Sequence, residues 1–553
     1  MSGVSEPHRR HRDVIIIGSS FGGALAAWPL VHAGRDVLML ERGPWVRRGP
    51  ENWEPDGTLI RTPYFNGGSE FRAHTAKGVE LTSTTSCVGG ASVFYGAVSL
   101  RYRERDFLPD PEIVTDSGAE WPIRYADLQH YYQAAERILG VAGRAGVDPT
   151  EPARVAGYAA EPTSLSEVSR RIGEGARSLG LRPFPLPLAI SFANGAGHGG
   201  RAGDDATAAD GGLPFGTCVE CATCDTFACA VGAKNDVASR VLPRLIARGL
   251  ELRSDTAVTG LVAEKGRVTG VRCEDRRTGE TYDVTADVVV LAAGALSTPH
   301  LLLAAGLHER NPAGDVVGRY LTRHCAAIVY GAYPWIPSHS HEFHKQLGIH
   351  DYYFGDDNPR GPSGKLGGIQ QVQTPSMGTV EAVMPRATHP FLRQVVTRVT
   401  GLLVLAEERP QYDNHVRIVP EETDDNGLPR LEVEHRYADR DLAARRRLIA
   451  RAREIHRAVR SPAQYAHRID TFSHALGTVR MGHDPQRNPL DADCRFRGLE
   501  NLYVADGSAL PTGGGVNPSL TIAANALRVG AGIVARGSSD AGKRWRARVG
   551  AAP

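Results

Sequence analysis

The first forty residues combine two apolar runs with a glycine-rich segment between them. Residues 13–17 predict a short buried strand, which leads directly into the glycine-rich segment 18–23. An Ala- and Leu-rich stretch at 24–32 predicts a helix, and a second apolar run at 36–40 predicts another strand that ends at Glu41. The order strand, glycine turn, helix, strand and acid is typical of a βαβ unit that binds a dinucleotide.

Each residue type in this unit suits a nucleotide. Gly18 permits a tight turn, Gly23 permits close helix packing, and the helix N-terminus offers free N–H groups to a pyrophosphate. Glu41 can accept hydrogen bonds from ribose hydroxyls, whereas Ser20 stands where the motif has its middle glycine. The alternative is a βαβ unit that binds nothing. The residues expected to contact a nucleotide here are Gly18, Ser20, Phe21, Gly22, Gly23 and Glu41.

The hydrophobic pattern changes several times along the rest of the chain. Residues 194–212 are rich in Gly, Ala and Asp and predict a long flexible surface loop, of the kind that forms a lid. The other predicted elements are a helix at 125–139, short alternating strands at 251–283, a buried strand at 287–291 that is followed at 292–299 by a turn into another helix, an antiparallel sheet within 326–420 and an Arg-rich helix at 438–459.

Composition and charge narrow the class of protein. Lys plus Arg number 64 and Asp plus Glu number 62 among 553 residues, so no basic field argues for nucleic acid as a partner. The longest apolar run near the N-terminus spans only residues 14–17, which is too short for a signal peptide or a membrane span. We therefore expect a soluble, cytoplasmic protein without a membrane partner.

Further motifs lie far apart in the sequence. A Gly-Gly-Ala-Ser segment occupies 89–92, a glycine turn occupies 294–299, and the C-terminal part contains the blocks 474–482 and 501–519. Together with the opening unit, these motifs resemble those of the FAD-dependent glucose-methanol-choline (GMC) oxidoreductases, in the order typical of that family. The resemblance extends from residue 13 to about residue 535.

This resemblance implies oxidation of an alcohol to an aldehyde or ketone, with hydride transfer to the flavin N5. His474 and Asn517 match the family's residues on the substrate side of the flavin. Histidine can take the hydroxyl proton near neutral pH, and an asparagine amide can orient the substrate oxygen without adding a titrating group. The alternative for His474 is a core histidine bonded to a carbonyl.

The resemblance also implies how FAD is held. Phe94 stands where some members carry a histidine linked to flavin, so non-covalent FAD is expected. The Asp506-Gly507 turn is expected along the ribityl chain and pyrophosphate, and the helix that begins near Pro518 points toward the flavin pyrimidine. The residues expected to bind the cofactor, beyond those of the opening unit, are Gly89, Gly90, Ser92, Tyr95, Val258, Ala293, Gly294, Asp506, Gly507, Asn517 and Pro518.

The implied fold has two domains, an architecture shared with p-hydroxybenzoate hydroxylase. An α/β, Rossmann-like FAD-binding domain is assembled from discontinuous segments, and an α+β substrate-binding domain presents an antiparallel sheet to the flavin. The expected FAD-binding domain comprises residues 1–48, 80–105, 217–325 and 476–540, and the expected substrate-binding domain comprises residues 49–79, 106–216 and 326–475.

The substrate is less well defined than the chemistry. Tyr95 and the segments 101–103 and 182–188 resemble the branch that oxidises the 6′-hydroxyl of aminoglycosides such as paromamine, so a sugar-like or other polyol substrate from natural-product biosynthesis is expected. A sterol or other hydrophobic alcohol is the alternative, because residues 501–521 also resemble those of cholesterol oxidases. A flavin-binding protein without turnover is the third alternative.

Glu407, Glu408 and Asp413 are candidate carboxylates for a cationic sugar, with a solvated strand edge as the alternative. The motifs do not distinguish O2 from another electron acceptor, and they do not define the oligomeric state.

Four of the eight cysteines lie close together, at Cys218, Cys221, Cys224 and Cys229. Their spacing is compatible with an iron–sulfur cluster or another metal, with one or two disulfides, or with free thiols. Ala230 follows the last cysteine where ferredoxin-type runs have proline. We therefore favour no metal at these positions.

Overall fold

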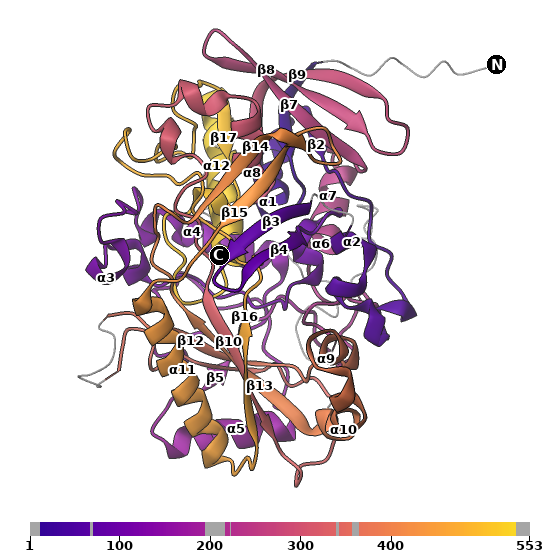
Figure 1. The fold of residues 1–553 in the computed structure, drawn as a ribbon, viewed down its shortest axis with the longest axis vertical. Helices are drawn as coiled ribbons and strands as arrows, with labels where there is room; N and C mark the ends of the chain where they lie inside the picture. Colours follow the sequence, from indigo (N-terminus) through magenta and orange to yellow (C-terminus); the bar gives the residue numbers. More distant parts are fainter. Residues whose placement is uncertain are drawn as a thin grey trace, which may run out of the picture.

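The computed structural model describes residues 11–66, 70–193, 216–221, 223–338, 342–356 and 364–537. The strands in these residues form three sheets, and Figure 1 shows two of them in opposite halves of the molecule, with the C-terminal helix α12 in the upper half. The predicted loop at 194–212 lies outside the described residues.

The sheet in the upper half has the order β6-β2-β1-β9-β8-β7, and β17 pairs with β9. Strands β6, β2, β1, β9 and β17 pair with one another in parallel, whereas β7, β8 and β9 form an antiparallel meander. This mixture confirms the predicted α/β fold. The strands are β1 (His11–Ile17), β2 (Val37–Leu40), β6 (Glu251–Arg253), β7 (Thr256–Glu264), β8 (Arg267–Asp275), β9 (Thr281–Leu291) and β17 (Leu502–Val504).

The register of the parallel strands explains why motifs distant in sequence come together. Ile17 pairs with both Leu40 and Leu291, and Leu291 pairs with Val504. These four residues are the last of their strands, so the four strands end at one edge of the sheet. Ligands of parallel α/β sheets bind at this carboxyl edge.

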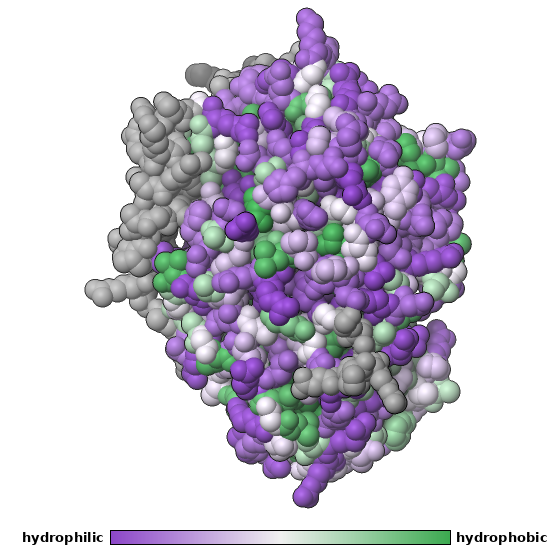
Figure 2. All heavy atoms as spheres, turned by 90° about the vertical axis from the view of Figure 1, so that its left-hand side faces the viewer, coloured by the Kyte–Doolittle hydropathy of each residue, from purple (hydrophilic) through white to green (hydrophobic). Residues whose placement is uncertain are grey.

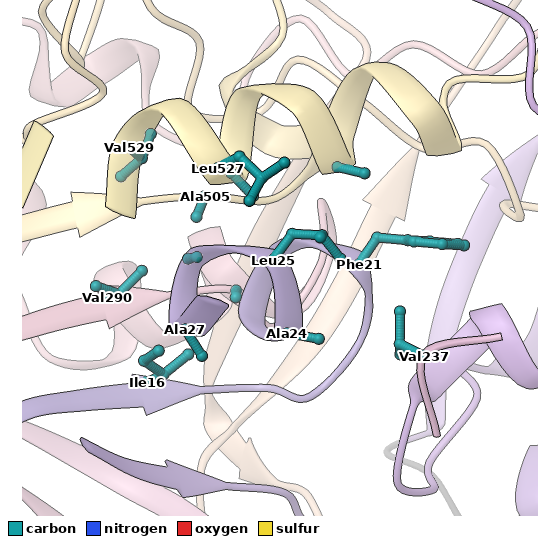
Figure 3. Packing of buried hydrophobic residues seen from close by; sticks show 14 of the residues in the cluster. Ile16, Phe21, Ala24, Leu25, Ala27, Val237, Val290, Ala505, Leu527 and Val529 are labelled. Carbon is teal, nitrogen blue, oxygen red and sulfur yellow. The ribbon is translucent and has the colours of Figure 1, made fainter. Parts of the chain in front are cut away.

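Two helices cover this sheet side by side. Helix α1 (Phe21–His32) follows β1 and packs against α12 (Ser519–Gly537), and Figure 3 shows Leu25 facing Leu527 across this contact. The two backbones approach closely, since a Cβ added at Gly530 would lie 2.3 Å from the carbonyl oxygen of Ala26. The predicted helix at 125–139 is confirmed as α4 (Tyr125–Leu139), which also packs against α12.

The sheet in the lower half is antiparallel, with the order β16-β10-β13-β12-β11-β5. Helices α11 (Asp439–Ala458) and α5 (Glu167–Ser178) pack on it, and α11 buries Ala444, Leu448 and Ile455 in the shared core. The strands are β5 (Phe184–Pro185), β10 (Cys325–Ala332), β11 (Leu347–Ile349), β12 (Gly367–Val372), β13 (Val399–Ala406) and β16 (Gln464–Ile469).

The region 326–420 is not one antiparallel sheet, contrary to the prediction. Helices α9 (Met377–Val383) and α10 (His389–Val395) interrupt it, and Ser376 caps α9 by accepting a hydrogen bond from the Thr379 N–H. Short segments rich in β-branched residues fit a helix as well as a strand, so the alternating pattern could not distinguish them. Strand β14 (His415–Thr423) belongs to a third sheet, with the order β14-β15-β3-β4.

The third sheet combines distant segments of the chain. It is completed by β15 (Pro429–Glu434), β3 (Glu70–Thr75) and β4 (Gly78–Ser83). The predicted boundary between residues 79 and 80 falls inside β4, so the division of the chain into domains stays a proposal. The remaining α-helices of the described residues are α2 (Pro63–Asn66), α3 (Pro111–Val114), α6 (Val237–Arg240), α7 (Leu242–Ala247) and α8 (Ser297–Ala304).

Hydrophilic residues dominate the face drawn in Figure 2, where hydrophobic residues form small separate patches. Among the described residues, no helix combines the length and the apolar character needed to cross a bilayer.

Candidate active site

The glycine turn after β1 is built for close backbone contacts. Gly18 has a φ of +100°, and a Cβ added there would lie 2.4 Å from the carbonyl oxygen of Ala292. A Cβ at Gly23 would lie 1.9 Å from the Gly18 carbonyl oxygen, and one at Gly22 would lie 2.7 Å from that of Ala505. Glycine is therefore required at all three positions, and the turn brings the N-terminus of α1 to the carboxyl edge, as a dinucleotide requires.

Glu41 lies at this edge, at the end of β2, and is buried. Its Oε2 accepts hydrogen bonds from the Ser19 N–H at 3.2 Å and the Ser19 hydroxyl at 2.6 Å, and its Oε1 accepts one from the Gly43 N–H at 3.1 Å. Burial raises the pKa of Glu41, while these hydrogen bonds oppose the rise. Ser19 therefore fixes the carboxylate. No motif in the sequence indicated this role for Ser19.

The Gly-Gly segment joins the same edge. The Gly89 N–H donates to the Ser19 hydroxyl oxygen at 2.9 Å, and a Cβ at Gly90 would lie 2.9 Å from that of Ser20. Both glycines have positive φ, of +89° and +52°. The predicted cofactor residues of the first turn and of this segment are thus in direct contact.

Two further predicted residues of this segment have partners inside the protein. The Ser92 hydroxyl donates to the Gly89 carbonyl at 2.7 Å, and the Tyr95 hydroxyl donates to the Asn235 carbonyl at 3.0 Å. The Tyr95 ring stands edge-on to Phe21, with 5.2 Å between ring centroids.

Asp506 connects two other segments at the edge. Its Oδ2 accepts from the Gly294 N–H at 2.9 Å and the Thr298 hydroxyl at 2.5 Å, and its Oδ1 accepts from the Ser508 N–H at 2.8 Å. Because both carboxylate oxygens have partners within the protein, Asp506 holds the turn before α8 against the 3-10 helix η11 (Gly507–Ala509).

The remaining predicted cofactor residues are placed as follows. Val258 is buried on β7 opposite Cys273, Ala293 is half-buried two residues after the end of β9, and Pro518 is buried immediately before α12.

Asn517 lies beside Pro518, in the loop that precedes α12. Its Oδ1 is buried and has no hydrogen-bond partner among the described residues. A buried polar atom without a partner is costly, so this amide is available to a bound cofactor or substrate.

The loop that contains Asn517 contacts the edge of the lower sheet. The Gly368 N–H donates to the Gly515 carbonyl at 2.9 Å, and the Gly514 N–H donates to Glu407 Oε1 at 3.0 Å. Gly368 lies in β12 and Glu407 follows β13, so this edge of the antiparallel sheet faces the predicted flavin site.

His474 is half-buried at the same junction. Its Nδ1 lies 2.9 Å from Nδ1 of His324, the residue immediately before β10. Burial, the neighbouring His324 and the charge of Lys345 lower the pKa of His474 to about 3. The ring is therefore neutral near pH 7, with a lone pair on one of its two nitrogens.

Lys345 is itself buried and forms an ion pair with Asp225, in the loop of clustered cysteines. This loop thus supplies the ion-pair partner of the lysine whose charge acts on His474. Neither Lys345 nor Asp225 belongs to a sequence motif that would have indicated a position near His474.

Glu407 and Glu408 are fully buried, so neither is a free carboxylate for a cationic substrate, and neither lies at a solvated edge. Glu407 pairs with Lys365 at 3.0 Å, and Glu408 accepts from the Arg323 N–H at 2.7 Å. Asp413 is exposed. The sequence pattern could not predict this burial, because it depends on the loop and helix that pack over the end of β13.

The four clustered cysteines are free thiols in the structure. Burial raises the pKa of Cys218 to about 12 and moves that of Cys224 well above its ordinary value. Among the residues that the structure describes, no three His, Cys, Asp or Glu side chains are arranged to hold a metal ion.

We expect metal analysis of the purified protein to find no stoichiometric iron or zinc, because burial raises the pKa of Cys218 and Cys224 and so disfavours the thiolates that bind metals. A thiol titration in denaturant without reductant should count all 8 cysteines. Iron and sulfide in equal stoichiometry, or a count reduced by two or four, would contradict the free-thiol state.

Comparisons with known proteins agree with this geometry. GMC oxidoreductase family models match residues 206–326 and 410–526. The chain is 32% identical to 6‴-hydroxyparomomycin C oxidase of Streptomyces lividus, over 96% of this chain and 92% of that protein. It is also 32% identical to paromamine 6′-oxidase of Streptomyces fradiae, over 93% and 90% of the two chains. The crystal structure of pyridoxine 4-oxidase from Mesorbium loti has the same fold, with a TM-score of 0.63 and 20% identity over 94% of this chain and 98% of that one. The chain belongs to the GMC oxidoreductases and is an FAD-dependent enzyme that oxidises alcohols.

Proposed function

We propose that this enzyme oxidises a CH–OH group of an amino sugar or a related polyol, with His474 as the base and Asn517 as the residue that orients the substrate oxygen. The observation that carries the proposal is the half-buried ring of His474, which contacts His324 at the junction with the loop of Asn517, whose amide oxygen has no partner in the described protein. The two Streptomyces relatives, whose names specify aminoglycosides, support the substrate class.

The residues of this chain have separate tasks in the proposed reaction. Bound FAD would be held by the carboxyl edge of the α/β sheet and supplies the acceptor for a hydride. His474 takes the hydroxyl proton as the carbon–hydrogen bond breaks, which avoids a separate alkoxide. Asn517 fixes the oxygen through its amide, and the lower sheet closes the site from the opposite side.

The substrate class can be tested with a panel of alcohols mixed anaerobically with the enzyme. An aminoglycoside with a free 6′-hydroxyl should bleach the flavin absorbance, and the same scaffold with a 6′-amine is the matched control that should not. A panel in which only sterols react would instead support a hydrophobic alcohol as substrate. Reoxidation with O2 and with an artificial acceptor then distinguishes an oxidase from a dehydrogenase.

We expect the FAD to be non-covalent. Phe94 occupies the position of the flavin-linked histidine of some relatives, and its buried side chain has no nucleophile. Acid or heat should therefore release the flavin into the supernatant. A yellow precipitate above a colourless supernatant would contradict this prediction.

A location in the cytoplasm is part of the proposal, since eight free thiols suit a reducing compartment. Size-exclusion chromatography coupled to light scattering will determine the oligomeric state.

A further inference from the structure

His324 lies between the two segments that carry the proposed catalytic residues. Its Nε2 lies 2.9 Å from the carbonyl oxygen of Gly514, three residues before Asn517, and its Nδ1 lies 2.9 Å from Nδ1 of His474. The rings of His324 and His474 are nearly perpendicular, at 87°, with 5.0 Å between their centroids. Both ring nitrogens of His324 therefore have a partner.

The chemistry of these partners determines where the protons lie. A carbonyl oxygen can only accept, so Nε2 of His324 carries the proton that is donated to Gly514. Burial lowers the pKa of His324 to about 4, so the ring is neutral near pH 7 and has a single N–H. Nδ1 of His324 consequently has a lone pair and acts as an acceptor.

The same reasoning extends to His474. The contact between the two Nδ1 atoms needs one proton, and His324 has none to give there, so Nδ1 of His474 carries it. A neutral imidazole with its proton on Nδ1 has a lone pair on Nε2. Resting on the proposed function, we infer that His324 is a positioning residue that sets the tautomer of His474, so that Nε2 of His474 takes the hydroxyl proton of the substrate.

The surrounding fold holds His324 in place. The neighbouring Arg323 N–H donates to Glu408, and Glu408 also pairs with His435 at 2.7 Å. The carbonyl oxygen of His324 accepts a hydrogen bond from the Tyr437 hydroxyl at 3.1 Å. Glu408 and its partners do not touch the substrate in this scheme. Through these contacts they fix the ring of His324.

In the proposed step, the hydroxyl O–H bond breaks and its proton forms a bond to Nε2 of His474. The hydrogen and the electron pair of the C–H bond would leave together as a hydride, for which FAD held at the carboxyl edge would supply the acceptor. The alcohol would thereby lose two electrons and become the carbonyl compound. His474 becomes an imidazolium whose Nδ1–H still donates to His324, and His324 stays neutral because its own N–H is donated to a carbonyl.

Two substitutions separate this role from simple packing. His324→Gln keeps an amide N–H for Gly514 and an oxygen acceptor for His474, whereas His324→Leu fills the space without either group. We expect the Leu variant to keep FAD but to lose about 10- to 100-fold in the rate of flavin reduction by alcohol, as for other residues that orient a reactive group. The Gln variant should recover most of this loss. Equal losses in both variants would contradict the positioning role.

A second readout does not depend on turnover or on the substrate. In wild-type protein labelled with 15N-histidine, the ring signals that disappear in His474→Ala identify His474. We expect its Nδ1 to be protonated and its Nε2 to be unprotonated. The opposite tautomer would overturn the inference even if His474 proves to be the base. If His474→Ala reduced its flavin at the wild-type rate, His474 would not be the base, but the tautomer measurement would remain valid.

Discussion

Replacing His474 with alanine should slow anaerobic flavin reduction by about 10²- to 10⁴-fold, the usual contribution of a positioned general base. FAD should remain bound, because the residues proposed to hold it, among them Gly18, Glu41 and Gly89, lie on other segments. The measurement is the single-turnover rate of flavin reduction, since steady-state turnover can be limited by reoxidation or product release.

Two variants complete this test. His483 is exposed and lies outside the site, so His483→Ala should reduce its flavin at the wild-type rate. Asn517→Ala should lose rate through misorientation of the substrate oxygen, but less than His474→Ala. An unchanged rate in His474→Ala would mean that the base is a different residue.

Replacing Gly18 with alanine should abolish FAD binding and lower the melting temperature. The residue has a φ of +100°, and the new Cβ would lie 2.4 Å from a backbone oxygen that cannot move without displacing β9. Backbone strain and overpacking each cost about 1–3 kcal/mol, so we expect a loss of about 2–6 kcal/mol in the free energy of unfolding. The FAD content and the melting curve of the purified variant measure the effect.

Gly34 offers a matched control in the same βαβ unit. Its φ is +76°, but a Cβ there would have no atom within 4 Å, so Gly34→Ala has the strain without the clash. We expect a loss of about 1–2 kcal/mol with FAD still bound. If the two variants retained the same amount of FAD, the close approach at Gly18 would not be needed for the cofactor.

The nucleotide-binding site at the carboxyl edge of the α/β sheet could be predicted because its motif lies within one short stretch of the sequence. A short apolar strand followed by Gly18 and Gly23 has few alternative structures, and the acid at Glu41 follows at the distance that one helix and one turn require. Asp506 and Gly294 could be assigned only through the family resemblance. Their convergence depends on the pairing of β9 with β1 and β17, which joins residues more than 200 positions apart.

Other features depend on tertiary contacts that leave no pattern in the sequence. His324 is one of 20 histidines, and nothing near it in the sequence indicates that it contacts His474. Glu407 and Glu408 follow an apolar strand, as exposed acids at a strand end also do, yet both have buried partners. The helices α9 and α10 interrupt a region whose composition favours strands, because short segments follow their surroundings rather than their propensity.

The most direct test of alcohol oxidation by this enzyme is anaerobic single-turnover mixing with an amino-sugar alcohol that carries either hydrogen or deuterium on the hydroxyl-bearing carbon. We predict that the flavin absorbance bleaches, that the product is the aldehyde or ketone, and that deuterium slows the bleaching because the C–H bond breaks in this step. A flavin that stays oxidised with every alcohol of the panel, in protein with a full complement of FAD, would contradict the proposed function.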